Sequence, residues 1–296
     1  MLYRISHATT YTYSEPVTLC HNLLHLTPRQ GPNQTCQRAQ ILVAPLPVVL
    51  VQETDYFGNA TLFFTIQEPH PKLAVTAQHL VEVTPPALPD AAQTIAWDQA
   101  AIHLREDLSV PGLDAYQYVF NSCYIKTNAQ LLDYGRSSFP PGRPLLEGVL
   151  DLTRRIHSEF HYDPEATTIA TPLAEVMARR RGVCQDFAHL EIGCLRALGL
   201  SARYVSGYLL TNPPPGQERL VGADASHAWI AVYCPGAGWI DVDPTNNQLP
   251  QEKHITLAWG RDYDDVSPIK GIILGGGRHS VRVAVDVAPG EEIQPT

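Results

Sequence analysis

The feature that most limits the possible folds of this chain is a change of hydrophobic periodicity across a proline-rich segment, residues 84–92 (TPPALPDAA). Before this segment, runs such as YRISHATTYTY, ATLFFTIQ and LAVTAQHLVEV are rich in Val, Ile, Thr, Tyr and Phe, which is typical of β-strands. After it, apolar residues recur at helical spacing. Because prolines at this density disfavour both helices and β-ladders, we expect residues 84–92 to link two domains.

The part after the linker reads first as helices and then as strands. Five apolar residues separated by three or four positions share one helix face: Leu145, Val149, Leu152, Ile156 and Phe160. A later helix is predicted to start near Cys184 and to stop at Gly199, a residue suited to a helix C-terminus. The runs ARYVSGYLL, SHAWIAVY and GWIDVD then read as strands. Helices followed by antiparallel strands indicate an α+β domain.

We therefore predict an α+β fold in which a β-sandwich precedes an α+β core. With 296 residues the chain is long enough for two domains of ordinary size. The predicted boundaries are an N-terminal β-sandwich domain in residues 1–88, a linker and helical lead-in in residues 89–150, a core in residues 151–266, and a C-terminal extension with one strand in residues 267–296.

Charge and composition narrow the possible partners and compartment. A formal net charge of -9 argues against nucleic acid, whose binders cluster Lys and Arg. No 18-residue apolar stretch is present, so a membrane partner is not expected. The start, MLYRISHATTYTYSEP, lacks the basic head and apolar run of a secretory signal. The six cysteines are widely spaced without CxxC pairs, which favours free thiols in the cytoplasm. The oligomeric state stays open.

Cys184, in the stretch RGVCQDFAHL, is the candidate nucleophile. Most cysteines are small buried hydrophobes, and Cys194 and Cys123 are interpreted in that way. Cys184 differs because it lies in the predicted first turn of a helix, where unpaired N–H groups and the helix dipole favour an anion. The arginines at 179–181 add positive charge, although a solvated helix end explains them equally well. We predict that Cys184 is held as a thiolate.

His227 is the most suitable partner among the twelve histidines. It opens SHAWIAVYCPGAGWIDVDPTN, which has the form of a β-hairpin in which alternate residues share a face. A turn centred on residue 235 would place His227 directly opposite Asp243, and one centred on 236 would make them diagonal neighbours, about 7 to 8 Å apart. Asp241 shares the face but lies further away. Asp243 is therefore predicted to orient the imidazole.

Four stretches around these residues carry a family resemblance: FHYDPEATTIATPLAEVMARRRGVCQDFAHL, ARYVSGYL, ADASHAWIAVY and GWIDVDPTNN. They resemble the transglutaminase-like superfamily of papain-fold cysteine enzymes. The N-terminal YRISHATTYTYSEPV and DYFGN resemble the β-rich first domain of its bacterial members. The resemblance implies a papain-like core with a catalytic triad of Cys184, His227 and Asp243, in agreement with the hairpin argument.

The chemistry that we predict is acyl transfer on an amide through a thioester on Cys184, which gives transglutamination or hydrolysis of a protein or peptide substrate. The Cys184 backbone N–H is the natural first oxyanion donor. Gln185, Trp229 and Trp239 are weaker candidates for oxyanion or substrate-binding residues. No cofactor or metal is predicted, and the acidic stretch DYDD at 262–265 is interpreted as a solvated turn.

Three alternatives remain at this level. The protein could be a cysteine peptidase or amidase without crosslinking activity. Cys184, His227 and Asp243 could instead be three ligands of a zinc ion with an open position, and metal analysis would decide this. The fold could also serve as a non-catalytic protein-binding module, which would leave Cys184 no more reactive than the other thiols.

Overall fold

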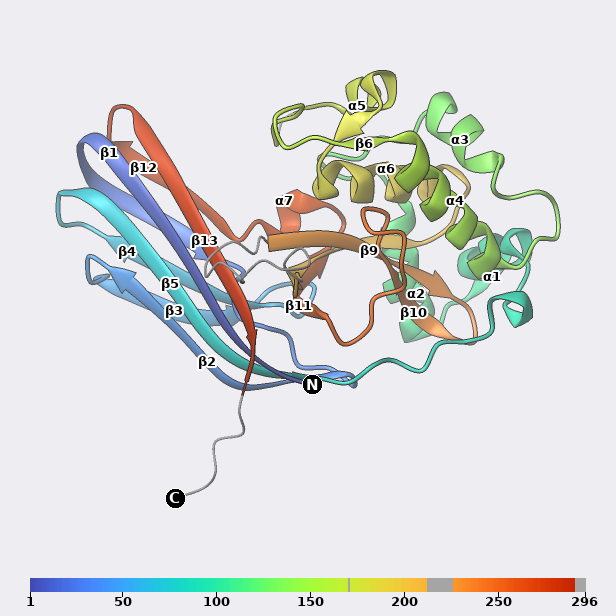
Figure 1. The fold of residues 1–296 in the computed structure, drawn as a ribbon, viewed down its shortest axis with the longest axis horizontal. Coiled ribbons are helices and arrows are strands. Elements are labelled where there is room, and N and C mark those ends of the chain that lie inside the picture. The colour runs from blue at the N-terminus through green and yellow to red at the C-terminus, as the bar shows by residue number, and fades with distance from the viewer. Residues whose placement is uncertain (170, 212–225, 291–296) are drawn as a thin grey trace, which may run out of the picture.

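The structure, a computed structural model, describes residues 1–169, 171–211 and 226–290. It confirms the predicted α+β class (Figure 1). A large sheet that contains the N-terminal strands lies on the left of Figure 1, the helices lie on the right, and a four-stranded sheet lies between them.

The long strand β1 organises the N-terminal sheet. The first five strands are β1 (Leu2–Leu24), β2 (Gln34–Ala44), β3 (Val49–Thr54), β4 (Ala60–Ile66) and β5 (His70–Val83). They are ordered β2-β5-β1-β4-β3, and the first half of β1 pairs with β5 whereas its second half pairs with β4. Both halves contribute to one hydrophobic core. Because β1 is hydrogen-bonded to β5 and then to β4, the N-terminal strands form one continuous sheet. The sequence predicts a sandwich of two sheets for the same strands.

The C-terminal segment returns to this sheet. Its strands β12 (Ile269–Gly275) and β13 (His279–Pro289) both pair antiparallel with β1, and they lie beside it in Figure 1. The prediction of a single strand in residues 267–296 is wrong, since the segment forms two. The sequence pattern does not reveal the first strand because Lys270 and Gly271 interrupt its apolar residues. The glycines 275–277 form the turn between the two strands, and all have positive φ. Residues 267–290 are therefore part of the N-terminal sheet.

The helices follow the linker. They are η1 (Ala91–Gln93), α1 (Trp97–Glu106), α2 (Val110–Tyr116), η2 (Gln117–Val119), α3 (Ala129–Arg136), α4 (Leu145–Glu159), α5 (Leu173–Arg179), α6 (Cys184–Ala197) and α7 (Tyr263–Val266). The boundary predicted after residue 150 would cut α4, which already begins after Pro144. All five apolar residues predicted on its inner face are buried. No helix in the described ranges has the length and apolarity that a membrane crossing requires.

The four-stranded sheet separates two packing environments. Its strands are β8 (Ala202–Leu209), β9 (Ser226–Cys234), β10 (Gly238–Val242) and β11 (His254–Gly260), in the order β10-β9-β8-β11. The short strands β6 (His161–Tyr162) and β7 (Arg181–Gly182) form a separate parallel pair. Ala228, Ile230 and Val232 pack with the helices. Trp229 and Ala231, which alternate with them, form a separate cluster. The two faces of β9 thus bury different sets of side chains.

Two amide side chains attach the N-terminal sheet to β11. Gln34 bonds to both the backbone N–H and the carbonyl of Thr256, each at 2.8 Å. Asn59 does the same with Trp259, each at 2.9 Å. Because each amide satisfies a donor and an acceptor of the strand, it replaces two bonds that another strand would make. The edge strand β11 is thereby covered by the N-terminal part of the chain.

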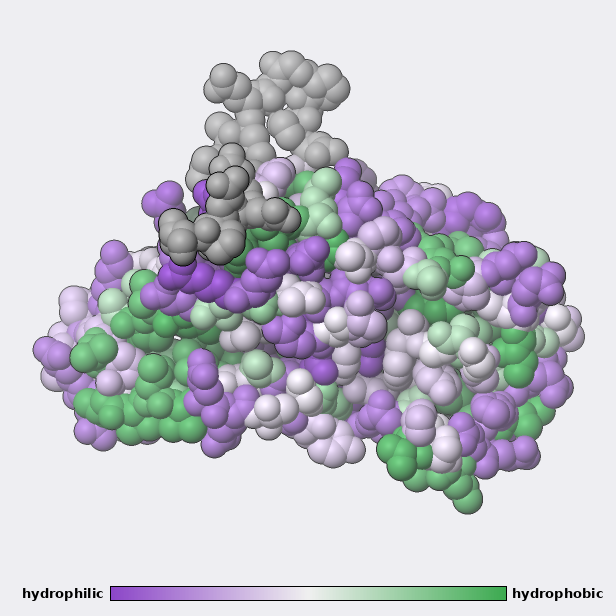
Figure 2. All heavy atoms as spheres, turned by 90° about the horizontal axis from the view of Figure 1, so that it is seen from below, coloured by the Kyte–Doolittle hydropathy of each residue, from purple (hydrophilic) through white to green (hydrophobic). Residues whose placement is uncertain are grey.

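The far end of the N-terminal sheet leaves hydrophobic side chains exposed. Leu46, Val48 and Leu50 have relative exposures of 85%, 60% and 55%. Figure 2 shows hydrophobic side chains gathered at the left end of the molecule, where Figure 1 places the N-terminal sheet. This end lies opposite the helices, so it is separate from the candidate site that follows.

Candidate active site

Cys184 is the first residue of α6, as predicted, and local contacts fix that helix start. The side chain of Asp186 is buried and its Oδ2 accepts hydrogen bonds from the Val183 N–H at 2.8 Å and from the Thr167 hydroxyl at 2.6 Å. A Cβ on Gly182 would lie only 2.7 Å from that oxygen, so a glycine is required there. These contacts hold Cys184 where unpaired helix N–H groups favour an anion.

His227 and Asp243 come together at one end of the β9–β10 hairpin. Val242 pairs with Ile230, which centres the turn on residue 236 and confirms the second of the two registers considered. The two side chains are thus diagonal neighbours. His227 Nε2 lies 2.8 Å from Asp243 Oδ2, so the carboxylate accepts a hydrogen bond from the imidazole.

Asp243 is fully buried and surrounded by donors. Its Oδ1 accepts bonds from the backbone N–H groups of Thr245 (2.9 Å) and Asn246 (3.2 Å). Its Oδ2 accepts bonds from His227, from His254 Nε2 at 3.0 Å, and from Asn246 Nδ2 at 2.8 Å. Burial alone would raise the pKa of Asp243, but the bonds from His227 and His254 outweigh it and lower the pKa. The carboxylate is therefore ionised throughout the neutral range.

His227 also interacts with Cys184. Burial lowers the pKa of His227, but hydrogen bonds with Asp243 and Cys184 raise it to about 10. Because Nε2 faces Asp243, the other ring nitrogen, Nδ1, is the one left for the cysteine. At neutral pH the ring is therefore an imidazolium between Asp243 and the sulfur. The structure brings together all three residues of the predicted triad, from α6, from β9 and from the segment after β10.

The weaker candidates lie elsewhere. Gln185 is half-buried in the first turn of α6, and its side chain has no hydrogen bond within the described ranges. Trp229 is fully buried, so a substrate cannot contact it. The centroid of its ring lies 6.0 Å from that of His227, and the two rings are stacked. Its Nε1 donates a hydrogen bond to Asp241 at 3.1 Å. Trp239 lines a separate cavity. Of the two tryptophans, only Trp229 touches the triad, and it does so as support for the imidazole.

Sequence reasoning missed two tyrosines near the cysteine. Burial raises the pKa of both Tyr162 and Tyr204, and the charge of Cys184 raises each pKa further. Tyr162 is 47% exposed, whereas Tyr204 is buried. Both lie inside stretches that carry the family resemblance, FHYDP and ARYVSGYL, but nothing in their spacing points to Cys184. The additional Asp243 partners His254 and Asn246 were missed for the same reason.

A buried glutamic acid lies close to the triad. Glu191 of α6 is fully buried, and its Oε1 accepts a hydrogen bond from the Thr153 hydroxyl at 2.7 Å. Its Oε2 has no partner among the described residues. Burial raises the pKa of Glu191 to about 8; the Thr153 bond opposes this, and the charge of Asp243 adds to it. Glu191 is therefore protonated at neutral pH.

The remaining cysteines are all free thiols in different environments. Cys194 is buried, as predicted. Cys123 is exposed, contrary to the prediction, because it lies in the irregular connection between η2 and α3, where helical periodicity does not apply.

His227, Asp243 and His254 are a possible set of metal ligands, since their ligand atoms all lie within 4.8 Å of one another. The two ring nitrogens, however, approach the same oxygen, Asp243 Oδ2, at hydrogen-bond distances. That oxygen also accepts a bond from Asn246. The observed distances therefore fit a hydrogen-bond network centred on the carboxylate.

The acidic stretch 262–265 is more structured than a solvated turn. Asp262 is buried, and its carboxylate accepts bonds from the Tyr124 N–H at 2.7 Å and the Asp264 N–H at 2.9 Å. Asp264 also pairs with Lys270 at 2.7 Å. The interpretation as a solvated turn is wrong for Asp262, which caps α7.

Two family descriptions match the chain. Residues 3–82 match the bacterial transglutaminase-like N-terminal region, and residues 138–244 match the transglutaminase-like superfamily. The second range contains Cys184, His227 and Asp243. It also contains Tyr162 and Tyr204.

Several known proteins are similar to this chain. An uncharacterized protein of Mycobacterium tuberculosis is 40% identical over 98% of this chain and 93% of its own length. One of Mycobacterium leprae is 32% identical over 96% of this chain and 97% of its own length. A protein-glutamine gamma-glutamyltransferase of Pseudomonas aeruginosa is 30% identical over 129 residues, 37% of this chain and 19% of that protein. A solved structure from Cytophaga hutchinsonii, described as a candidate cysteine protease, has a TM-score of 0.75 at 20% identity and covers 100% of this chain and 93% of that one. That likeness shows a shared fold.

Proposed function

This chain belongs to the transglutaminase-like superfamily, and on that premise we propose that it catalyses cysteine-dependent acyl transfer from an amide through a thioester on Cys184. The observation that carries the proposal is the continuous contact from Asp243 through His227 to Cys184. A nucleophile, a base within hydrogen-bond reach and a group that orients the base are the arrangement that this chemistry requires.

In the first half-reaction the Cys184 thiolate attacks the amide carbonyl carbon. A C–S bond forms and the carbonyl oxygen becomes an oxyanion, for which the backbone N–H of Cys184 at the start of α6 is one donor. The C–N bond then breaks, and the leaving nitrogen takes the proton of the His227 imidazolium. Asp243 holds the ring in orientation through Nε2, which leaves Nδ1 directed at the reaction.

In the second half-reaction the now neutral His227 accepts a proton from the acyl acceptor. The acceptor attacks the thioester carbonyl, the C–S bond breaks, and the thiolate and imidazolium are restored. A primary amine as acceptor gives a new amide, which is transglutamination, and water gives hydrolysis. Both outcomes use the same three residues, so the acceptor depends on access to the thioester rather than on the triad.

We propose a glutamine side chain as the acyl donor. This rests on the similarity to the Pseudomonas aeruginosa protein, whose name states glutamyl transfer and whose matching region is 30% identical. The alternative, cleavage of a peptide bond, uses the same thioester and differs only in the leaving group.

The test is incubation of the full chain with a pool of glutamine-containing peptides, with and without a primary amine, followed by mass spectrometry. Amine adducts on glutamine would demonstrate transglutamination. Deamidation that requires no amine would demonstrate hydrolysis of the side chain, and shortened peptides would support the peptidase alternative.

The variant Cys184→Ala and the matched control Cys123→Ala show whether the products are enzymatic. We expect the first variant to form no product and the second, which removes an exposed thiol, to behave as the wild type. Products that persist in Cys184→Ala, or no product with the wild type in any arm, would contradict the proposal.

A further inference from the structure

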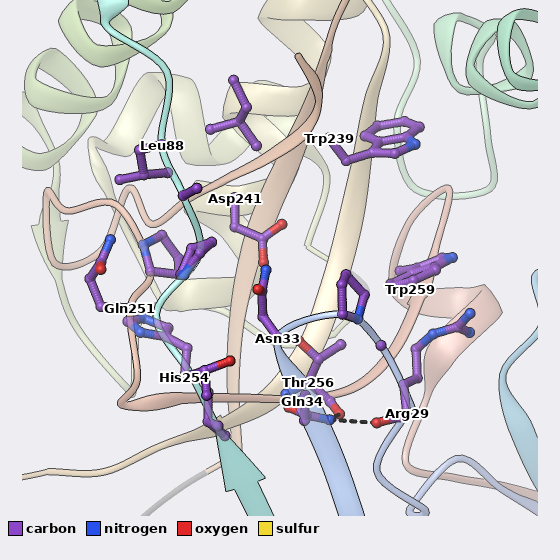
Figure 3. A pocket seen from close by; sticks show the side chains of 18 of the residues that line it. Arg29, Asn33, Gln34, Leu88, Trp239, Asp241, Gln251, His254, Thr256 and Trp259 are labelled. Carbon is purple, nitrogen blue, oxygen red and sulfur yellow. Dashed lines mark hydrogen bonds between the residues drawn. The ribbon is translucent and has the colours of Figure 1, made fainter. Parts of the chain in front are cut away.

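A cavity of about 530 Å³ lies where the N-terminal sheet, the linker and the four-stranded sheet meet (Figure 3). We call it the arginine pocket and define it by Arg29, Arg203, Trp239, Asp241 and Trp259. The linker closes one side with apolar residues, including Leu88. The three triad residues are not among those that line it. The arginine pocket is therefore distinct from the site of the proposed reaction.

Two arginines and two tryptophans alternate in one stack in this pocket. The Arg203 guanidinium carbon lies 4.1 Å from the ring centroid of Trp239 and 3.6 Å from that of Trp259. The Arg29 carbon lies 3.4 Å from the same Trp259 centroid. Two carbons this close to one centroid would overlap on a single face, so the arginines lie on opposite faces of Trp259. Both faces of the Arg203 guanidinium are thus covered, and only its N–H edge can bind a partner.

That edge has no protein partner among the residues that the structure describes. Arg203 is 7% exposed, and it makes no hydrogen bond or ion pair within those ranges; its Nε is buried and unpaired. Burial lowers the pKa of Arg203 to about 10, and attraction to Asp241 opposes this. The guanidinium therefore stays charged at neutral pH. Arg29, by comparison, donates to the Phe57 carbonyl and the Asn59 side chain.

Asp241 presents an acceptor to the same cavity. Figure 3 shows its side chain near the centre of the pocket, between Trp239 and His254. One oxygen, Oδ2, accepts the Trp229 N–H. Burial raises the pKa of Asp241, although the charge of Arg203 opposes the rise. No ion pair within 4.0 Å joins Asp241 to Arg203 among the described residues, so a cationic edge and a carboxylate face one cavity without meeting.

We propose that the arginine pocket binds a small molecule that carries an α-carboxylate and a neighbouring nitrogen donor, which is the chemistry of a free amino acid or the C-terminal residue of a short peptide. The Arg203 edge matches a planar carboxylate in a bidentate geometry. Asp241 accepts from the adjacent ammonium or amide N–H. Inorganic phosphate carries between one and two negative charges at neutral pH, which the Asp241 carboxylate would repel, and it has no ammonium or amide N–H to bind there. The apolar linker wall around Leu88 suits an aliphatic side chain.

Tryptophan fluorescence of the full chain gives the readout, because Trp239 and Trp259 line the pocket and Trp229 bonds to Asp241. The probes are leucine, glycyl-leucine, leucinamide, 4-methylpentanoate and inorganic phosphate, each titrated to about 10 mM. We expect leucine or glycyl-leucine to change the emission with saturation, and the one that binds more tightly identifies the source. Leucinamide, which lacks the carboxylate, and phosphate should not saturate.

The variant Arg203→Gln should weaken leucine or glycyl-leucine binding at least about tenfold, since a charged hydrogen-bond partner is lost. The matched control Arg282→Gln changes an exposed arginine outside the pocket and should bind as the wild type. Asp241→Asn should weaken leucine but leave 4-methylpentanoate, which has no amino group, at least as well bound. If circular dichroism shows that Arg203→Gln does not fold, the opposite effects of Asp241→Asn on leucine and 4-methylpentanoate binding still test the proposal.

Three results would overturn the proposal. They are the absence of any saturable change with leucine and glycyl-leucine, equal binding of leucine and leucinamide, and unchanged binding by a folded Arg203→Gln protein. None of these depends on acyl transfer, so the outcome is separate from that of the proposed function.

Discussion

The triad and the arginine pocket both take residues from the β9–β10 hairpin and the segment directly after it, yet their polar groups are satisfied in opposite ways. Asp243 and Asp241 are two positions apart in the chain. Asp243 accepts five hydrogen bonds, whereas the one side-chain bond to Asp241 in the described structure comes from Trp229. The buried ring of Trp229 stands between the two regions, because it stacks on His227 and bonds to Asp241.

The comparison separates the effect of burial from that of hydrogen bonding. Burial raises the pKa of both aspartates, but only Asp243 has enough donors to reverse the effect. Its carboxylate is held charged and fixed beside His227, which is the preorganisation that catalysis requires. Near Asp241 the charged Arg203 is buried and has no hydrogen-bond partner among the residues that the structure describes, an arrangement that a ligand would complete.

The pair Asp243→Asn and Asp241→Asn tests this contrast with the same chemical change at each position. Asparagine at 243 keeps the size but cannot balance the imidazolium of His227. We expect acylation by p-nitrophenyl acetate, measured as release of p-nitrophenol, to fall about 10² to 10⁴-fold. Asparagine at 241 should leave the rate within about threefold, because Asp241 bonds to Trp229 rather than to the triad.

A fall of similar size in both variants would contradict the separation of the two regions. Thermal unfolding of each variant shows whether a lost rate is only lost folding. Asp241→Asn should be at least as stable as the wild type at neutral pH, because the pKa of Asp241 is raised in the folded protein and asparagine resembles the favoured neutral form.

Glu191 is an exception to this contrast, because it is buried close to Asp243 and yet one of its oxygens has no hydrogen-bond partner in the described part of the chain. Its pKa rises from 4.5 to about 8 on folding. The contribution of Glu191 to stability is therefore complete below pH 4.5 and is lost as the pH rises to about 8. The full change is on the order of 5 kcal/mol. Glu191→Gln should remove this fall while leaving acylation nearly unchanged.

The measurement is urea unfolding of wild type and Glu191→Gln between pH 5 and about 8. His7, His79 and His189 have pKa values lowered by burial, and their contributions rise with pH below 6.5. The difference between the two proteins therefore reports Glu191. The control Glu106→Gln, at an exposed position, should show the same dependence of the unfolding free energy on pH as the wild type. If the curve of Glu191→Gln runs parallel to that of the wild type, Glu191 is not protonated in the folded protein.

Much of the fold and the central contact could be predicted because both follow local patterns. The helical spacing around Leu152 predicted the buried face of α4. Alternation along the hairpin from His227 predicted that Asp243, rather than Asp241, would meet the imidazole, and the observed register is one of the two considered.

The rest depends on contacts between distant segments, which local patterns do not contain. The pairing of β12 and β13 with β1 joins the two ends of the chain, so residues 267–290 could not be assigned to the N-terminal sheet. His254 reaches Asp243 from β11, and Arg29 reaches Trp259 from the first domain. For the same reason Trp239 was placed near the triad, although its side chain belongs to the arginine pocket.

The most direct test of the central claim, that Cys184 is a nucleophile activated by its contact with His227, is the rate at which iodoacetamide alkylates each thiol near neutral pH, resolved by mass spectrometry. Cys123 is the internal control, because it is exposed whereas Cys184 is only partly so. We predict that Cys184 reacts at least about tenfold faster than Cys123, because the His227 imidazolium beside it activates the sulfur as a nucleophile. Equal rates for the two thiols would contradict the claim.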